Sequence, residues 1–500
     1  MTIHLTAADY GAVLPIMIVL GGALCLLLTD AFVKVHETEI ATGISLATLL
    51  LAFAASAHLW AVNAGPAFPQ GAGAMITGDR FGQFFNFALL LSSALAILIA
   101  PPYIRTSHFD AGEFLSLILF ATAGMMLMAA SLNLMVIFLS IELLSLALYI
   151  LSGFDRNRPR SQEAGFKYFL LSSFASAFLI YGMALIYGAT GSTNLIRIVN
   201  VLGGHAGTVA STHTVLSSPF VLIGIALMAV GFAFKLSIVP FHMWTPDVYQ
   251  GAPTPVTAFM SVATKAAVFP AFLRVFNLAL GAESHRWFGI LWALAIVTMI
   301  VGNVLALSQS SMKRLLAYSG IAHAGYVLVA MSANNRLGAT AVAFYFIVYA
   351  FMNIGAFALV LVLESRGEAG DEIATYRGLF ARSPLLAVAT GVFMFSLAGF
   401  PPTAGFFAKY YAFAAAVQAG HTELAIIGVI TSVISLGYYL RVVVLMFMQP
   451  VEAGAEQVRA GPLSDFMLTA SVAGLFVVGL VPWFYNLAVQ AVQSFFHFTT

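Results

Sequence analysis

The sequence predicts an all-α polytopic membrane protein of about fourteen transmembrane helices, with two inverted five-helix repeats that each contain a discontinuous helix. Composition is the first reason, because 61% of the 500 residues are hydrophobic and only 8% are charged, whereas soluble domains carry roughly 25% charge. The second reason is that long apolar runs follow one another along the whole chain. The third is that prolines interrupt two of these runs.

Each apolar run is long enough to cross the hydrocarbon core, which takes roughly 20 helical residues. The first run lacks a preceding basic segment and is too long for a cleavable signal peptide, so we expect it to be a membrane helix. No soluble domain fits between the runs; the longest loops are 189–217 and 365–383. The expected spans are 11–30, 40–62, 82–100, 113–131, 132–152, 163–188, 218–245, 254–280, 287–308, 314–332, 338–364, 384–418, 422–448 and 465–490.

Two of these spans should be discontinuous helices. Pro240 lies within 218–245, and Pro401 and Pro402 divide 384–418. As one straight helix at 1.5 Å per residue, the second of these spans would be about 54 Å long, well beyond roughly 30 Å of hydrocarbon. Proline removes a backbone donor and clashes with the preceding turn. Such breaks persist at membrane depth only where protein or water satisfies the freed backbone groups.

The spans divide the chain into four parts. Residues 1–112 hold three N-terminal spans, 113–280 and 281–448 hold five spans each, and 449–500 hold a loop and the last span. A broken helix is the fourth span of each five-span unit. Because five is odd, the second unit starts from the opposite side of the membrane, so we expect the two units to form an inverted repeat.

Positive charge is unevenly shared between the two sides of the membrane. Inner loops are normally enriched in Lys and Arg. With the N-terminus outside, twelve cationic residues fall on the inner side and five on the outer side. We therefore expect both termini on the outer, periplasmic side of a bacterial cytoplasmic membrane. The inner group is Lys34, Arg105, Arg156, Arg158, Arg160, Lys313, Arg314, Arg366, Arg377, Arg382, Arg441 and Arg459; the outer group is Arg80, Arg197, Arg274, Arg286 and Arg336.

Five ionisable residues stand inside otherwise apolar segments: Glu142, Lys167, Lys235, Lys265 and Lys409. At the centre of a membrane helix each such group costs roughly 2.5–3.5 kcal/mol on insertion scales. Residues of this kind normally face a protein interior or a water-filled path, and they mark routes for protons or ions. We therefore expect them to form a candidate site for proton translocation.

Three lysines are the strongest candidates for proton carriers. Lys235 precedes a helix break, where loosened carbonyls can accept its protons, and Lys409 follows the other break. Lys265 should lie near the middle of its span. A desolvated lysine can exchange protons at neutral pH, although each could instead clamp helices together. Glu142 is too deep for its short side chain to reach water, so it is either a charge partner for Lys235 or a neutral group that joins two helices.

The remaining candidates carry weaker signals. Lys167 is near the inner end of its span, where its long stem could reach the interface. His323 could relay protons, but a hydrogen-bonded core histidine has the same sequence pattern. His242 and Asp247 could line the inner mouth of the path, or serve ordinary loop and packing roles.

Several classes of function are not supported. A net charge of +1 offers no basic patch for a nucleic acid. The single cysteine, Cys25, cannot form a disulfide within the chain, an iron–sulfur cluster or a cysteine zinc site. The sequence contains no P-loop, dinucleotide-binding fingerprint, HExxH or nucleophile elbow. We therefore expect no cofactor in this chain, and energy must come from an ion gradient or a partner.

Three longer motifs resemble one known family. They are KLSIVPFHMWTPDVYQGAPTPVTAFMSVATK (235–265), SQSSMKRLLAYSGIAHAGY (308–326) and LAGFPPTAGFFAKYY (397–411). Together they resemble the antiporter-like subunits of respiratory complex I, and the resemblance covers nearly the whole chain. Within that family the chain is most similar to the bacterial N subunits. Lys409 occupies a position where M subunits typically have glutamate, and the long lateral helix of L subunits does not follow the last span.

The resemblance implies a mechanism. In this family the glutamate matching Glu142 pairs with the lysine matching Lys235, and the lysines matching Lys167, Lys265 and Lys409 continue a row of proton carriers. The last carrier is expected to connect to the outer side. Quinone reduction elsewhere in the NADH:quinone oxidoreductase would drive the protons, while FMN, iron–sulfur clusters and quinone belong to other subunits. The implied partners are the lipid bilayer, a neighbouring antiporter-like subunit and small membrane subunits.

Two other interpretations stay open on the sequence. An Mrp-type Na⁺/H⁺ antiporter subunit shares much of the same core, but sodium prefers oxygen ligands to lysines. An inert scaffold, whose buried charges only hold helices together, would tolerate neutral replacements of Lys235 or Lys409.

Overall fold

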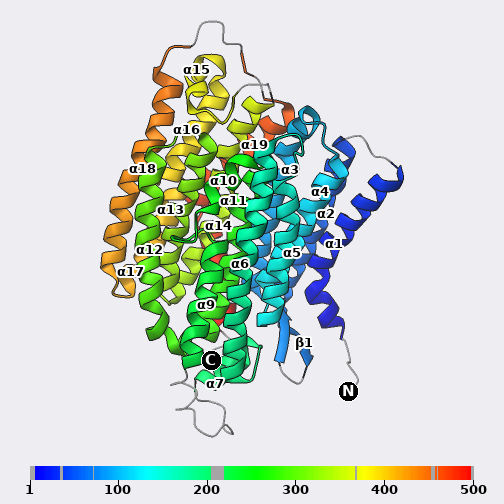
Figure 1. The fold of residues 1–500 in the computed structure, drawn as a ribbon, viewed down its shortest axis with the longest axis vertical. Helices are drawn as coiled ribbons and strands as arrows, with labels where there is room; N and C mark the ends of the chain where they lie inside the picture. The colour runs from blue at the N-terminus through cyan, green and yellow to red at the C-terminus, as the bar shows by residue number, and fades with distance from the viewer. Residues whose placement is uncertain are drawn as a thin grey trace.

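The computed structural model describes residues 6–33, 38–70, 73–203, 219–365, 369–451, 457–458 and 460–496. Helices run along the long axis of an elongated bundle, and the described parts of both chain ends lie toward its lower end in Figure 1. Charged residues of the predicted inner group occur where α3 ends, where α6 and α13 begin, and around α15, which lies at the upper end. Of that group, Lys34, Arg366 and Arg459 lie outside the described residues.

The expected fourteen spans are confirmed. Twelve helices are long and apolar enough to cross a membrane, and two discontinuous helices supply the other two. The unbroken helices are α1 (Ala7–Val33), α2 (Thr38–Val62), α3 (Arg80–Thr106), α4 (Ala111–Ala130), α5 (Leu134–Ser152), α6 (Pro159–Thr190), α11 (Thr254–Leu273), α12 (Ser284–Leu307), α13 (Met312–Ser332), α14 (Arg336–Glu364), α18 (Thr422–Met448) and α19 (Pro462–Leu480).

The two broken helices lie where the prolines predicted them. The first consists of α9 (Pro219–Lys235) and α10 (Trp244–Gly251), and the second of α16 (Pro384–Ala398) and α17 (Ala404–Gln418). The Val239–Pro240 and Pro401–Pro402 peptide bonds are cis. The last expected span is also interrupted, because α20 (Pro482–Phe496) begins at a proline directly after α19.

Two expected loops contain regular structure that the sequence did not indicate. Strands β1 (Pro66–Gln70) and β2 (Gly73–Thr77) form an antiparallel hairpin between α2 and α3. Its strands are short and β1 contains two prolines, but distant segments stabilise the hairpin: Leu132 donates its amide to the Met75 carbonyl at 2.9 Å. A short helix, α7 (Leu195–Leu202), lies within the expected loop 189–217. The other short elements are the π-helix Arg274–Ala279, the 3₁₀ turns Gly281–Glu283 and Ile373–Tyr376, and α15 (Leu379–Arg382).

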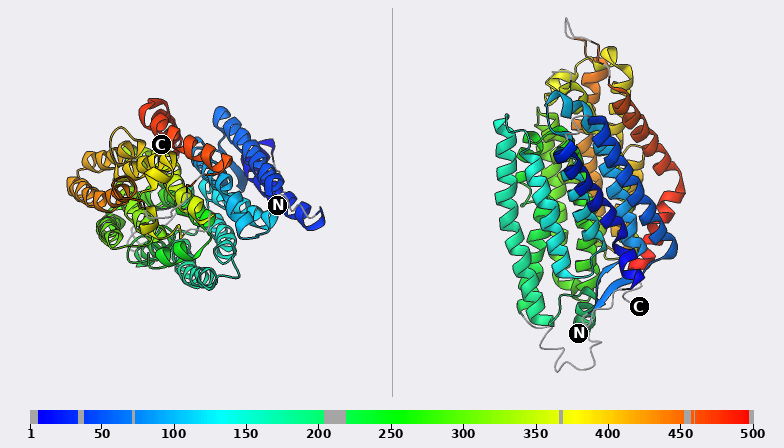
Figure 2. Two further views of the ribbon diagram at one scale, coloured as in Figure 1. Left: turned by 90° about the horizontal axis from the view of Figure 1, so that it is seen from above. Right: turned by 90° about the vertical axis from the view of Figure 1, so that its right-hand side faces the viewer.

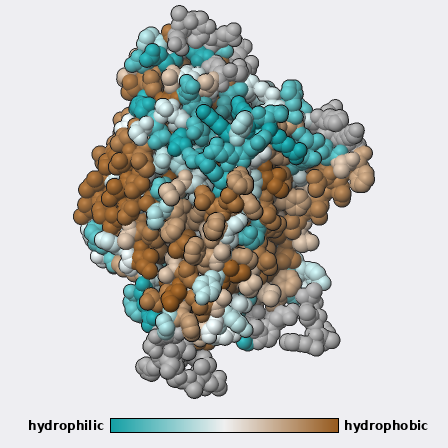
Figure 3. All heavy atoms as spheres, in the orientation of Figure 1, coloured by the Kyte–Doolittle hydropathy of each residue, from teal (hydrophilic) through white to brown (hydrophobic). Residues whose placement is uncertain are grey.

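The bundle has a distinct core and an apolar rim. Every residue in the most apolar stretch of α11 is buried, whereas only a third of the corresponding stretches of α1, α18 and α19 are. Figure 2 shows the bundle nearly end-on when the molecule is viewed from above. Figure 3 shows a hydrophobic belt on one face, with a polar region near the upper end. Large exposed side chains such as Leu50, Phe174 and Val433 fit a surface that contacts lipid.

Candidate functional site

Buried ionisable side chains form a row across the bundle, from α5 to α17. Lys235, Lys265 and Lys409 are only 4%, 2% and 5% exposed, respectively. His323 is also buried, and Glu142 is half-buried. The structure therefore places five of the six residues that the sequence singled out in a mostly apolar interior: Glu142 acts electrostatically on Lys235, and Lys265 and Lys409 act on His323.

Serine hydroxyls separate Glu142 from Lys235 at the start of this row. Ser176 donates to the Glu142 carboxylate at 2.6 Å. The Lys235 ammonium donates to Ser145 at 2.6 Å and to Ser172 at 2.5 Å. Ser145 lies three residues after Glu142 on α5, and Ser172 lies four before Ser176 on α6, so each pair shares a helix face. Serine hydroxyls on α5 and α6 therefore lie between the carboxylate and the ammonium, and the described residues show no direct ion pair of Glu142 with Lys235 within 4.0 Å.

Protein groups satisfy the backbone at the first helix break. The indole of Trp244 donates to the Phe234 carbonyl at 3.0 Å, and the Val239 amide donates to the Thr298 hydroxyl at 3.1 Å. The sequence led us to expect that loosened carbonyls would accept protons from Lys235. Instead the lysine bonds to hydroxyls on α5 and α6, and its ammonium also lies over the ring of Tyr149 at 5.7 Å.

Lys265 reaches from α11 to the backbone of α13. Its ammonium donates to the Gly320 carbonyl at 2.9 Å and lies 5.8 Å from the centre of the Tyr349 ring. A β-carbon at position 320 would come within 2.9 Å of this ammonium and 3.0 Å of the Tyr349 hydroxyl. Glycine at 320 therefore leaves the space in which the lysine head group sits.

His323 lies between Lys265 and Lys409. Its Nδ1 is 2.6 Å from the Tyr345 hydroxyl, and its Nε2 is 3.4 Å from the Tyr439 hydroxyl. Both lysines are close enough to act on the imidazole electrostatically. A neutral imidazole has one donor and one acceptor nitrogen, so with its tyrosine partners it can pass protons in either direction.

Lys409 bonds directly to the second helix break. Its ammonium donates to the Ala398 carbonyl at the end of α16 at 2.9 Å, and to Ser432 on α18 at 2.8 Å. It also lies 4.9 Å from the centre of the Tyr326 ring. Beside it is an apolar groove of about 830 Å³ between α16, α17 and α18, which extends to Gln418.

Lys167 lies apart from the row. Its side chain is 39% exposed and forms ion pairs with Glu163 at 2.6 Å and Asp247 at 3.0 Å. Asp247 also pairs with Arg314 at 2.7 Å, so it links α6, α10 and α13. Together with Asp247, Lys167 lines a small cavity of about 190 Å³. His242 is half-buried in the first break, and its buried Nδ1 has no hydrogen-bond partner among the described residues.

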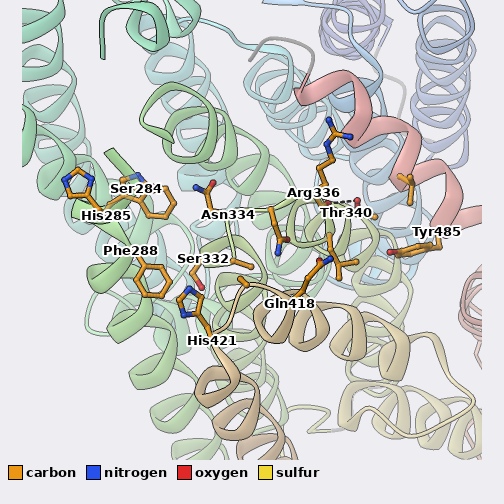
Figure 4. Close-up of a pocket in the computed structure, with 16 residues that line it drawn as sticks. Ser284, His285, Phe288, Ser332, Asn334, Arg336, Thr340, Gln418, His421 and Tyr485 are labelled. Carbon is orange, nitrogen blue, oxygen red and sulfur yellow. Dashed lines mark hydrogen bonds between the residues drawn. The ribbon is translucent and has the colours of Figure 1, made fainter. Parts of the chain in front are cut away.

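Two further cavities lie toward the ends of the bundle. One, of about 560 Å³, is lined by residues including Arg158, Lys313, Glu364 and Asp371 at the predicted inner end. The other, of about 820 Å³, is lined by the ends or beginnings of α12, α13, α14 and α17 and by α20, as Figure 4 shows. Gln418 lines both this outer cavity and the groove beside Lys409.

Sequence reasoning missed the polar partners of the row. Ser145, Ser172 and Ser432 each bond to a buried lysine, while Tyr345 and Tyr439 contact His323. A signal was present for one of them, because Ser145 is three residues from Glu142 and so lies on the same face of that helix. No group of three or more potential metal ligands occurs among the residues that the structure describes.

Comparison with known proteins identifies the family. The family model described as NADH:quinone oxidoreductase/Mrp antiporter, TM, matches residues 131–435. A relative from Trichlorobacter lovleyi, called NADH-quinone oxidoreductase subunit N, is 48% identical over 404 residues, 81% of this chain and 81% of the relative.

Solved structures share the fold. A chain of respiratory complex I from Thermus thermophilus is 33% identical with a TM-score of 0.76, over 94% of this chain and 97% of the other. A chain of the Mrp complex from a Dietzia species has a TM-score of 0.82 but only 21% identity, with 97% of each chain covered. The chain belongs to the NADH:quinone oxidoreductase/Mrp antiporter transmembrane family, and within it to the N subunits of NADH-quinone oxidoreductase.

Proposed function

We propose that this protein is a membrane-arm subunit of a bacterial NADH:quinone oxidoreductase and moves protons along Glu142, Lys235, Lys265, His323 and Lys409. The observation that carries this proposal is the buried row itself. Three lysines are almost fully buried among apolar helices, and each donates to a hydroxyl or carbonyl on another segment. Such groups are costly in a membrane interior, and they normally mark ion or proton paths.

The residues of the row can hold and release protons in turn. A neutral lysine amine accepts a proton on its lone pair, and an ammonium donates one. Serine and tyrosine hydroxyls both donate and accept, so they can connect a lysine to its neighbour by passing one proton for each proton received. Glu142 is close enough to act on Lys235 electrostatically and, when ionised, it favours the protonated form of that lysine through a medium of low dielectric constant.

Quinone reduction would supply the driving force from elsewhere in the complex. In this proposal FMN, the iron–sulfur clusters and the quinone site belong to other subunits, and this chain carries out no redox step. A change of charge next to Glu142 would shift the proton on Lys235, and the shift would spread to Lys265 and Lys409. The inner membrane location, the outer position of both termini and a neighbouring antiporter-like subunit are parts of the same proposal.

The groove and the outer cavity suggest where protons leave. Lys409 is the last lysine of the row, and Gln418 follows it nine positions later on α17. Since Gln418 lines both spaces, water and the Gln418 amide can connect Lys409 with the outer end of the bundle.

The decisive experiment uses inverted membrane vesicles from cells that carry Lys235→Ala. NADH-driven quinone reduction and vesicle acidification are measured together, and assembly of the complex is checked on a native gel. We expect an assembled complex in which both activities fall to background. Wild-type activity and pumping would contradict the proposal.

The same vesicles distinguish the alternatives. An Mrp-type antiporter predicts normal NADH-driven pumping with loss of Na⁺ tolerance in the variant. At 21% identity, the similarity to the Mrp complex chain shows a shared fold and no more. An inert scaffold predicts that a size-matched neutral substitution, Lys235→Met, leaves pumping intact in every complex that assembles.

A further inference from the structure

A second line of polar groups connects Lys265 with the predicted inner end of the bundle. It follows the interface of α11 with α14, which pack against each other in opposite directions. On α11, Thr254, Thr257 and Ser261 precede Lys265 at intervals of three, four and four residues, so they share its helix face. The proposed function uses none of these three residues.

The inner end of this line reaches a cavity. Glu364, the last residue of α14, lines the cavity of about 560 Å³ and pairs with the buried Lys313 at 3.0 Å. Thr254, the first residue of α11, donates its hydroxyl to the same carboxylate. The Glu364 carboxylate therefore contacts both the cavity and the first polar group on α11.

Deeper along the same interface, two buried polar atoms have no hydrogen-bond partner among the described residues. Asn353 donates to the Ser261 hydroxyl at 2.6 Å, but its own carbonyl oxygen accepts no hydrogen bond within the described structure. The Tyr349 hydroxyl, one turn away on α14, is also buried without a described partner. Buried polar atoms are nearly always satisfied, and ordered water is the usual partner where protein groups are lacking.

We propose that protons reach Lys265 from the inner side along the α11–α14 interface, through Glu364 and through water held by Asn353 and Tyr349. This inference rests on the proposed function, since it supplies protons to the same row. The Glu364 carboxylate takes a proton from cavity water and passes it to the hydroxyl and water chain. Each oxygen of that chain receives one proton and releases one. At the end the neutral amine of Lys265 becomes an ammonium, and Glu364 is a carboxylate again.

Tyr349→Phe is the sharpest test of this route. The substitution removes only the hydroxyl, which bonds to no described protein group, so a purely structural role predicts unchanged assembly and pumping. The route predicts normal assembly but about a tenfold lower vesicle acidification per NADH oxidised, because a water on the path loses its hydrogen bond to the Tyr349 hydroxyl. Wild-type acidification in Tyr349→Phe would overturn the proposal.

Asn353 gives an independent comparison between a larger and a smaller side chain. Asn353→Leu fills the space with apolar atoms, and Asn353→Ala leaves room for water. The route predicts about a tenfold loss of acidification in Asn353→Leu and wild-type acidification within about twofold in Asn353→Ala. If the residue only joins two helices, Asn353→Ala is at least as harmful as Asn353→Leu, because it leaves a cavity.

Two controls complete the design. The pair Ser93 and Thr122 joins α3 to α4 through a buried hydroxyl contact of 2.8 Å away from the row, so Ser93→Ala with Thr122→Val should leave pumping unchanged. Lys265→Ala distinguishes a failure of the uptake route from a failure of the proposed function. If it abolishes pumping while Tyr349→Phe and Asn353→Leu do not, the route fails and the proposed function stands. If Lys265→Ala pumps normally, the proposed function itself fails.

Discussion

The two broken helices differ in where the lysine lies relative to the break and in which groups it contacts. Lys235 ends the first half of its helix and bonds to serines on α5 and α6, while Trp244 and Thr298 satisfy the broken backbone. Lys409 lies in the second half of its helix and bonds to the Ala398 carbonyl at the break itself. Two proline breaks that look equivalent in sequence therefore differ in how the nearby lysine is hydrogen-bonded.

In the proposed function, this difference gives the two regions distinct tasks. The partners of Lys235 belong to helices that also carry Glu142 and Ser176, so its proton responds to charge on that side of the bundle. Lys409 has an apolar groove beside it and bonds to the break, so a movement of α16 against α17 changes its hydrogen bonds directly. The first arrangement suits the receipt of a charge signal, and the second suits release.

The largest effect should come from removing the lysine of the second break. In Lys409→Met the apolar side chain fills the site but carries no proton, so we expect proton pumping to fall by about a hundredfold or more. The pumping rate of the variant is measured as the acidification of vesicles that contain the assembled complex. Pumping above a tenth of the wild-type rate would contradict the assignment of Lys409 as a carrier.

Removal of the hydroxyl partners should separate the two lysines. Ser145→Ala combined with Ser172→Ala takes both hydrogen-bond partners from Lys235, and we expect about a tenfold loss of pumping. Ser432→Ala leaves Lys409 its bond to Ala398, so we expect a loss of only about threefold. Pumping is measured as acidification per NADH oxidised. Equal losses in the double variant and in Ser432→Ala would contradict the proposed difference between the two breaks.

The indole at the first break gives a test of stability. Trp244→Phe removes the indole donor from the buried Phe234 carbonyl, which keeps only the Ser237 amide at 3.1 Å, and the loss of this hydrogen bond should lower the free energy of unfolding by about 0.5–1.5 kcal/mol. Trp287→Phe is the matched control, because its indole donates to the Leu280 carbonyl at 2.9 Å away from the break. Thermal unfolding should show similar losses for both variants, while only Trp244→Phe should also reduce pumping.

The smallest effect is expected at Lys167. Its ion pairs with Glu163 and Asp247 are partly exposed, and pairs of this kind contribute about 0–1 kcal/mol. Lys167→Ala should therefore keep pumping within about twofold of wild type. A loss as large as that of Lys409→Met would place Lys167 among the carriers, as the family resemblance implies.

Features that depend on local sequence were predictable. Run length gave the fourteen spans, and Pro240 and Pro401 marked the two breaks. The burial of Lys235, Lys265 and Lys409 followed from their apolar surroundings, because membrane interiors do not tolerate exposed charge.

Contacts between distant helices were not predictable. Ser172 and Tyr439 become partners of the row only through the packing of α6 and α18, which no local pattern reports. The β1–β2 hairpin depends in the same way on Leu132 and Asn194 from other segments. For Lys167, position within the span left two roles open, and Asp247 on α10 supplies the partner that keeps it near the inner end.

In the proposed path Lys265 lies between the two regions, so it offers the most direct test of a continuous proton path. The measurement is vesicle acidification per NADH oxidised in Lys265→Met, with assembly verified on a native gel. The account predicts an assembled complex that does not acidify the vesicles, because no proton can pass from Lys235 to His323 and Lys409. Acidification at the wild-type ratio would contradict it and would reduce the buried row to structural contacts.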